Sequence, residues 1–193
     1  MFSFFWYSYI KRRKNKLDWN EFSQLEHINE DLILEFIDYV NIPLIMTNFN
    51  INLSYAFIKK YASHLEHNNL DKFCENLDIV LENRIKNNQP IDWKRVSLIP
   101  ISEKLIIKYI DYITWPEISE NSNLNLSVNF YQTYFQYFNW ELIFANHTKL
   151  DNILVENYAK YVDWNKISKM QVSVEIIHKY HDKETARIFD RKI

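Results

Sequence analysis

The stretch Asp92–Ile113, DWKRVSLIPISEKLIIKYIDYI, contains the pattern that determines the fold. It starts with Asp92, a residue type that caps helices, and continues with Trp93 and the apolar Val96. A second cap type, Ser102, is followed by apolar residues at offsets of 3, 4, 7 and 11, which lie on one side of a helix. The stretch therefore predicts two short helices joined by a loop, each with one apolar stripe.

Both halves of this unit recur along the chain. A cap type precedes Trp or another apolar residue at Asp18-Trp19, Asn41-Ile42, Asn69-Leu70, Asp92-Trp93, Thr114-Trp115, Asn139-Trp140 and Asp163-Trp164. The second cap recurs at Asn29, Ser54, Asp78, Ser102, Ser127, Asp151 and Ser173, with successive spacings of 25, 24, 24, 25, 24 and 22 residues. The residue three positions after the second cap is apolar in every copy. Such a fixed period is typical of repeat proteins.

We therefore predict an all-α fold, an α-solenoid of about seven two-helix repeats of about 24 residues. The first helix of each repeat has six or seven residues, and the second has about 12 and a length of about 18 Å. The chain forms one domain over 1–193, with an N-terminal capping helix over 1–17, the repeats over 18–182 and a C-terminal cap over 183–193. The copy over 69–92 departs most from the pattern, so we expect irregular stacking there.

The composition excludes several classes of function. The 193-residue chain has no glycine, which removes Gly-rich phosphate loops and dinucleotide-binding fingerprints. A formal net charge of −2 disfavours binding of nucleic acid through phosphates. The aromatic segment Met1–Ile10 is too short to span a bilayer, and its basic residues follow it, unlike those of a signal peptide. We expect an intracellular protein that is not secreted and has no transmembrane segment.

The sequence provides no convincing catalytic, metal or cofactor site. The repeated Trp position is interpreted as core between repeats, with ligand stacking as the alternative. The pairs His64/His67 and His178/His181 lack the third and fourth ligands that zinc requires. Cys74 occupies a position held by serine in other copies, which indicates a tight packing site in preference to a nucleophile. We expect no metal, no cofactor, no small-molecule substrate and no enzymatic activity.

Two groups of residues are candidates for binding a partner. The first is a terminal patch in which aromatic residues opposite the core stripe adjoin a basic run; it comprises Phe4, Phe5, Tyr9, Lys11, Arg12 and Arg13. The alternative is that the chain itself buries this helix. The second lies ten residues after the second cap and comprises Tyr39, Tyr112, Tyr137 and Tyr161, with His64 at the same offset. These residues form either a binding ridge along one edge or part of the core.

The repeat resembles a short helical repeat of uncharacterised proteins from amoeba-infecting giant DNA viruses, mimivirus relatives especially. The resemblance covers 18–182 and rests on Asp-Trp-x-x-Ile-Ser at Asp163–Ser168 and on the second half at Leu53–Tyr61 and Ile101–Tyr109. It implies a viral repeat protein and brings no catalytic residues with it.

We therefore expect a non-catalytic scaffold that binds viral or host proteins, located in the host cytoplasm or the virion. One alternative is an RNA-binding repeat protein, because offset 6 carries Lys60, Arg84, Lys108 and Lys179. Glu35, Thr133 and Asn157 interrupt that basic row. Another alternative is a structural component of the virion.

Overall fold

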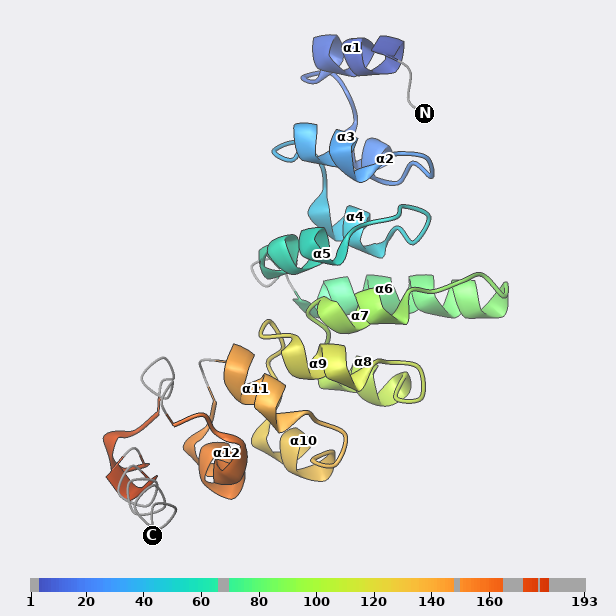
Figure 1. The fold of residues 1–193 in the computed structure, drawn as a ribbon. Coiled ribbons are helices and arrows are strands. Elements are labelled where there is room, and N and C mark those ends of the chain that lie inside the picture. Colours follow the sequence, from blue (N-terminus) through green and yellow to red (C-terminus); the bar gives the residue numbers. More distant parts are fainter. Residues whose placement is uncertain (1–3, 66–69, 148–149, 165–171, 177, 181–193) are drawn as a thin grey trace.

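The protein is all-helical in the computed structural model, and no strand occurs in the residues that it describes, 4–65, 70–147, 150–164, 172–176 and 178–180 (Figure 1). The α-helices are α1 (Phe4–Arg13), α2 (Trp19–Ser23), α3 (Glu30–Glu35), α4 (Ile42–Thr47), α5 (Tyr55–Ala62), α6 (Leu70–Lys86), α7 (Trp93–Leu98), α8 (Glu103–Lys108), α9 (Trp115–Glu120), α10 (Val128–Thr133), α11 (Trp140–Asn146) and α12 (Asn152–Asn157). The 3₁₀ turns η1 (Ser63–Leu65) and η2 (Ala159–Tyr161) follow α5 and α12. The predicted cap over 183–193 and the predicted helix cap Asn69 lie outside the described residues.

Figure 1 shows the helices following one another from α1 at the top to α12 near the bottom. We call α2, α4, α7, α9 and α11 the A helices and α3, α5, α8, α10 and α12 the B helices. Successive A helices contact one another: α2 contacts α4, and α9 contacts both α7 and α11. Among the B helices, α10 contacts α12. One hydrophobic cluster extends through the chain from Ile10 to Ile176. Because such short helices are marginal alone, neighbouring pairs supply the burial that stabilises each one.

The helix starts predicted from the caps are confirmed at most positions. Side chains of Asp18, Asn41, Asp92 and Asn139 accept backbone N–H groups at A helices, and those of Asn29, Ser54, Ser102, Ser127 and Asp151 do so at B helices. Thr114 precedes α9 without such a bond. The predicted stripe is also confirmed, since the residue three after each second cap is buried in every copy: Leu32, Phe57, Leu81, Leu105, Phe130, Leu154 and Ile176.

The second helix of the unit is shorter than predicted. α8 and α10 have six residues each, and the aromatic residue at offset 7 ends them with a non-helical backbone, at φ −111°, ψ 27° for Tyr109. A turn with bonds from residue i to i−3 continues the chain, as in Tyr112 N–H to the Tyr109 carbonyl at 2.9 Å. This turn still brings offset 11 into the core, where Ile113 and Phe138 are buried. The spacing of apolar residues at offsets 3, 4, 7 and 11 is therefore compatible with a short helix followed by a turn as well as with one longer helix.

The predicted hairpin at 69–92 is wrong. Asp78 does not cap a second helix, because α6 runs unbroken for 17 residues. Its buried residues Phe73, Leu77 and Leu81 lie four apart on one side of a continuous helix. Residues 70–86, which form α6, also lack Pro and are rich in Leu, Glu and Lys, which favour helix. The stacking changes here as expected, since α6 contacts α4 and α7 contacts α5.

Buried serines connect successive A helices. Ser23, Ser97 and Ser119 each donate to the carbonyl of the Trp four residues earlier, at 2.6, 2.9 and 2.8 Å. Each hydroxyl also accepts the backbone N–H of the cap residue of the next A helix, namely Asn41, Thr114 and Asn139, at 2.9 Å in all three cases. The serine thus bonds within its own helix and to the next copy.

The unpaired carbonyls at the ends of A helices are bonded by side chains of a later copy. The Asn48 amide donates to the carbonyls of Ser23 and Leu25 at 3.3 and 3.1 Å. The Asn121 amide donates in the same way to Ser97 and Ile99 at 3.0 and 2.9 Å. These bonds satisfy helix C-termini that lack intrahelical partners.

Arg95 performs this role where the repeat is irregular. Its guanidinium donates to the carbonyls of Ile45, Asn48 and Ile51, and only 2% of the residue is exposed. It lies 5.1 Å from the centre of the Phe49 ring. Burial lowers the pKa of Arg95 to about 10, so the side chain remains charged at neutral pH. A buried arginine therefore joins α7 to the loop between α4 and α5.

The B helices have their own connecting bonds. At three places the first residue after a B-helix cap accepts from the next B-helix cap: Glu30 from Ser54, Glu103 from Ser127 and Asn152 from Ser173. Tyr55 and Val128 occupy the same position in other copies, and no such bond is formed there within the described residues. At the irregular copy this position is Ile79, whose side chain cannot accept a hydrogen bond. No bond of this kind therefore joins α6 to α8.

Candidate functional site

The terminal patch is described only in part. The side chains of Phe4 and Phe5 lie outside the described ones. Tyr9 and the three basic residues after Ile10, Lys11 to Arg13, are exposed, and Ile10 is buried as the predicted stripe requires. The Arg13 guanidinium lies 5.0 Å from the centre of the Tyr9 ring. Four of the six residues of this patch are thus described and exposed, and three of them are cationic.

The four tyrosines at offset ten, Tyr39, Tyr112, Tyr137 and Tyr161, form what we call the tyrosine row. The same turn positions each of them, because its backbone N–H donates to the carbonyl three residues earlier, at 2.9, 2.9, 2.9 and 3.0 Å respectively. All four side chains are exposed. The row is therefore a repeated surface feature of the loops that lead from one copy to the next.

Tryptophans support the rings of three members of the row. Tyr137 stacks on Trp115 with ring centres 4.9 Å apart and an interplanar angle of 18°. Tyr112 stacks on Trp93 at 5.0 Å and 22°, and the ring of Tyr39 lies 5.2 Å from that of Trp19. Stacking fixes the orientation of an exposed ring, which lowers the entropy that a bound partner would have to restrict.

Lysine ammonium groups lie over the rings of two members of the row. The Lys14 ammonium lies 5.2 Å from the centre of the Tyr39 ring, and the Lys160 ammonium lies 4.7 Å from that of Tyr161. Both distances fall within the range of cation–π attraction. Among the described residues, no Lys or Arg lies over Tyr112 or Tyr137.

The tryptophans divide between core and surface. The prediction of burial is confirmed for Trp140, which is 4% exposed and stacks on Tyr158 at 3.6 Å. Four others, Trp19, Trp93, Trp115 and Trp164, are half-buried and pack against the core. They therefore contribute both to packing and to the support of the surface tyrosines.

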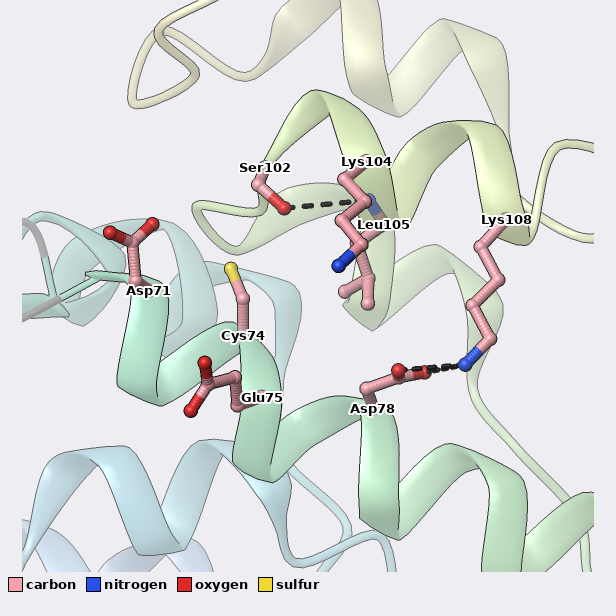
Figure 2. Close-up of a pocket in the computed structure, with 8 residues that line it drawn as sticks. All are labelled: Asp71, Cys74, Glu75, Asp78, Ser102, Lys104, Leu105 and Lys108. Carbon is pink, nitrogen blue, oxygen red and sulfur yellow. Dashed lines mark hydrogen bonds and ion pairs between the residues drawn. The ribbon is translucent and has the colours of Figure 1, made fainter.

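A groove of about 320 Å³ lies between α6 and α8 (Figure 2). It is lined by Asp71, Cys74, Glu75, Asp78, Ser102, Lys104, Leu105 and Lys108. Lys108 binds both carboxylate oxygens of Asp78 at 2.7 Å, and Tyr109 donates to the same carboxylate at 2.6 Å. Although burial opposes the charge of Asp78, these bonds outweigh it and lower the pKa of Asp78.

The groove does not have the chemistry of an activated nucleophile. Burial raises the pKa of the Cys74 thiol, against the effect of hydrogen bonds from Ser102. A reactive cysteine normally has a lowered pKa and a basic partner. The lining includes no histidine, and no group of three or more metal-ligating side chains occurs within the described part of the chain.

None of the described helices is long and apolar enough to cross a bilayer.

The comparisons with known proteins give one viral relative. The chain is similar to an uncharacterised 54.7 kDa protein, encoded in the IAP1-SOD intergenic region of Autographa californica nuclear polyhedrosis virus, with 32% identity over 94 residues. The match covers 48% of this chain and 20% of that protein. The chain thus has a weak homologue in a large DNA virus, and the resemblance to mimivirus relatives stays a prediction. No family profile matches the chain, and no solved structure is significantly similar to it.

Proposed function

We propose that the protein is a non-catalytic interaction scaffold of a large DNA virus, an α-solenoid of about seven two-helix repeats that binds viral or host proteins along the tyrosine row. The observation that carries this proposal is the row itself. Identical turns place four exposed tyrosines at equivalent positions, and tryptophans hold three of them in fixed orientations. Rigid, repeated, exposed aromatic side chains are typical of protein-binding surfaces.

The connecting hydrogen bonds support the solenoid part of the proposal. Serine, asparagine and glutamate side chains join equivalent positions of neighbouring copies, at sequence separations of 17 to 25 residues. In such a protein each repeat depends on its neighbours, and the stack offers an extended surface to a partner.

The basic row at offset 6 gives little support to the RNA-binding alternative. Arg84 is buried and donates to the Pro90 carbonyl at 3.0 Å. Lys108 is paired with Asp78, and Lys179 is paired with Glu156 at 2.8 Å. Three of the four cations thus have intramolecular partners, which reduces the charge that this row can offer to phosphates.

Affinity capture from cells infected with the source virus tests the proposal. The full chain is compared with a variant in which Tyr39, Tyr112, Tyr137 and Tyr161 are all replaced by Gln. We expect specific protein partners with the parent chain and their loss with the variant. The matched control replaces four exposed apolar residues outside the row, Ile79, Ile107, Phe135 and Ile153, by Gln.

Loss of partners in the control but not in the row variant would contradict the proposal. Circular dichroism and urea unfolding of both variants must first show that the fold is retained. Mass spectrometry of purified particles then separates an infection-stage scaffold from a structural component of the virion, because only the latter is retained in stoichiometric amounts.

A further inference from the structure

The tyrosine row contains two kinds of site. Tyr39 and Tyr161 already have lysine ammonium groups over their rings, at 5.2 and 4.7 Å. Tyr112 and Tyr137, in neighbouring copies, have no such cation among the described residues and are more exposed, at 53% and 47%. The contacts within the chain therefore show that a tyrosine at this position can accept an ammonium group. The rings of Tyr112 and Tyr137 are open to one from a partner.

The charges around Tyr112 favour a cation. Asp111 is exposed next to Tyr112, and Asp92 is exposed at the start of the helix whose Trp93 stacks on that tyrosine. The nearest basic residue on this helix, Lys94, is paired with Glu117 at 3.1 Å. A ring face and exposed carboxylates together attract an ammonium group more strongly than either does alone.

We propose that Tyr112 and Tyr137 bind two lysine side chains of one extended segment of a protein partner. This inference rests on the proposed function and names its ligand. Neighbouring packed helices lie about 8–10 Å apart. A segment in the extended polyproline II conformation has three residues per turn and rises about 3.1 Å per residue, so every third side chain lies on the same face, about 9.3 Å from the last. Two lysines separated by two residues therefore match the spacing of the two rings.

Titration with short peptides tests this inference. The probe is an N-acetylated, C-amidated peptide that contains Lys-Ser-Ser-Lys, and binding is followed through the indole N–H signals of Trp93 and Trp115 in nuclear magnetic resonance spectra. We expect Tyr112→Leu or Tyr137→Leu to weaken binding by roughly 2–5-fold each, as an exposed cation–π contact implies. Asp111→Lys leaves the stack intact and should weaken binding as well.

Phe135→Leu is the matched control, because Phe135 is 51% exposed in the loop that carries Tyr137 but belongs to no Trp stack in the described structure. It should leave the affinity unchanged. Acetylation of both peptide lysines should abolish binding, and moving them next to each other should weaken it.

Equal binding of the acetylated peptide would overturn the inference, and so would tighter binding of an oligouridine that depends on the same tyrosines. The proposed function would fail separately, through the loss of row-dependent partners in affinity capture. If captured partners still bind after their lysines are acetylated, the proposed scaffold function stands and the proposed recognition of lysine is wrong.

Discussion

The hydroxyl of Ser97 accepts the backbone N–H of Thr114 at 2.9 Å, so one small side chain joins the end of α7 to the start of α9. Ser97 is fully buried and also donates to the Trp93 carbonyl. Both hydroxyl functions are thus used at a fully buried position. The same arrangement recurs at Ser23 and Ser119, so the bond is not peculiar to α7 and α9.

Replacement of Ser97 by Ala should destabilise the protein by about 1–3 kcal/mol, because the N–H of Thr114 loses its acceptor away from water. Urea unfolding followed by circular dichroism measures the change. Ser122→Ala is the control, since Ser122 is exposed; its effect should stay within about 0.5 kcal/mol. Equal effects of the two substitutions would show that the buried bond contributes nothing.

Replacement of Trp140 by Ala should cost about 3–5 kcal/mol, the range for a large aromatic side chain lost from a core. Trp140 stacks on Tyr158, and its indole N–H donates to the Phe135 carbonyl at 3.0 Å. Trp93→Ala should cost less, because Trp93 is half-buried. Denaturant unfolding of both variants gives the comparison, and a cost below about 1 kcal/mol for Trp140 would contradict its burial.

Much of the fold could be predicted because caps and apolar residues act locally. Asn29 and Ser102 cap helices for reasons contained within four residues of sequence, so their positions could be found without knowledge of tertiary contacts. The failure at Asp78 has the same origin. A residue of a cap type, such as Asp78, stays inside a helix when the surrounding residues favour helix and neighbouring elements bury one continuous side of it. Only tertiary packing decides whether such a residue starts a new helix or continues the existing one.

The candidate site could be predicted only in part. The period revealed the tyrosine row but left open whether Tyr112 faced core or solvent, because offset 10 borders the buried stripe. Asn121 bonds carbonyls more than twenty residues away, but it lies seven residues after the first cap, as Asn48 does, and this recurrence could have revealed its role. The role of Arg95 could not be predicted, since it bonds carbonyls more than forty residues away and its position holds no arginine in the other copies. Long-range bonds of single residues leave no periodic signal.

Arg95→Met should destabilise the protein by about 2 kcal/mol or more, because three buried carbonyls lose their donor while the gain from removing a buried charge is smaller. Arg95→Lys should recover only part of this loss, since one ammonium cannot reproduce the geometry of the guanidinium. The exposed Arg12, replaced by Met, is the control for loss of a cation. If Arg95→Met proves as stable as the parent chain, the side chain does not join α7 to the preceding loop.

His147 should make the stability depend on pH. It is 6% exposed at the end of α11, its imidazole donates to the Ser119 carbonyl, and Nε2 has no hydrogen-bond partner within the described structure. Burial lowers the pKa of His147, only partly opposed by that bond. Since the unfolded chain then binds a proton more readily than the folded one, this stabilising contribution is present above about pH 6.5 and is lost as the pH falls through the lowered pKa.

The substitution His147→Asn separates titration from hydrogen bonding. Asn121 donates its amide to the equivalent carbonyl, that of Ser97, so asparagine can retain the bond without a titrating group. We expect the free energy of unfolding in urea to fall less between pH 7.5 and 5.5 for this variant than for the parent chain. His27→Asn, at an exposed position, should not flatten the dependence. Identical pH slopes for the parent and His147→Asn would mean that the buried imidazole does not resist protonation in the folded state.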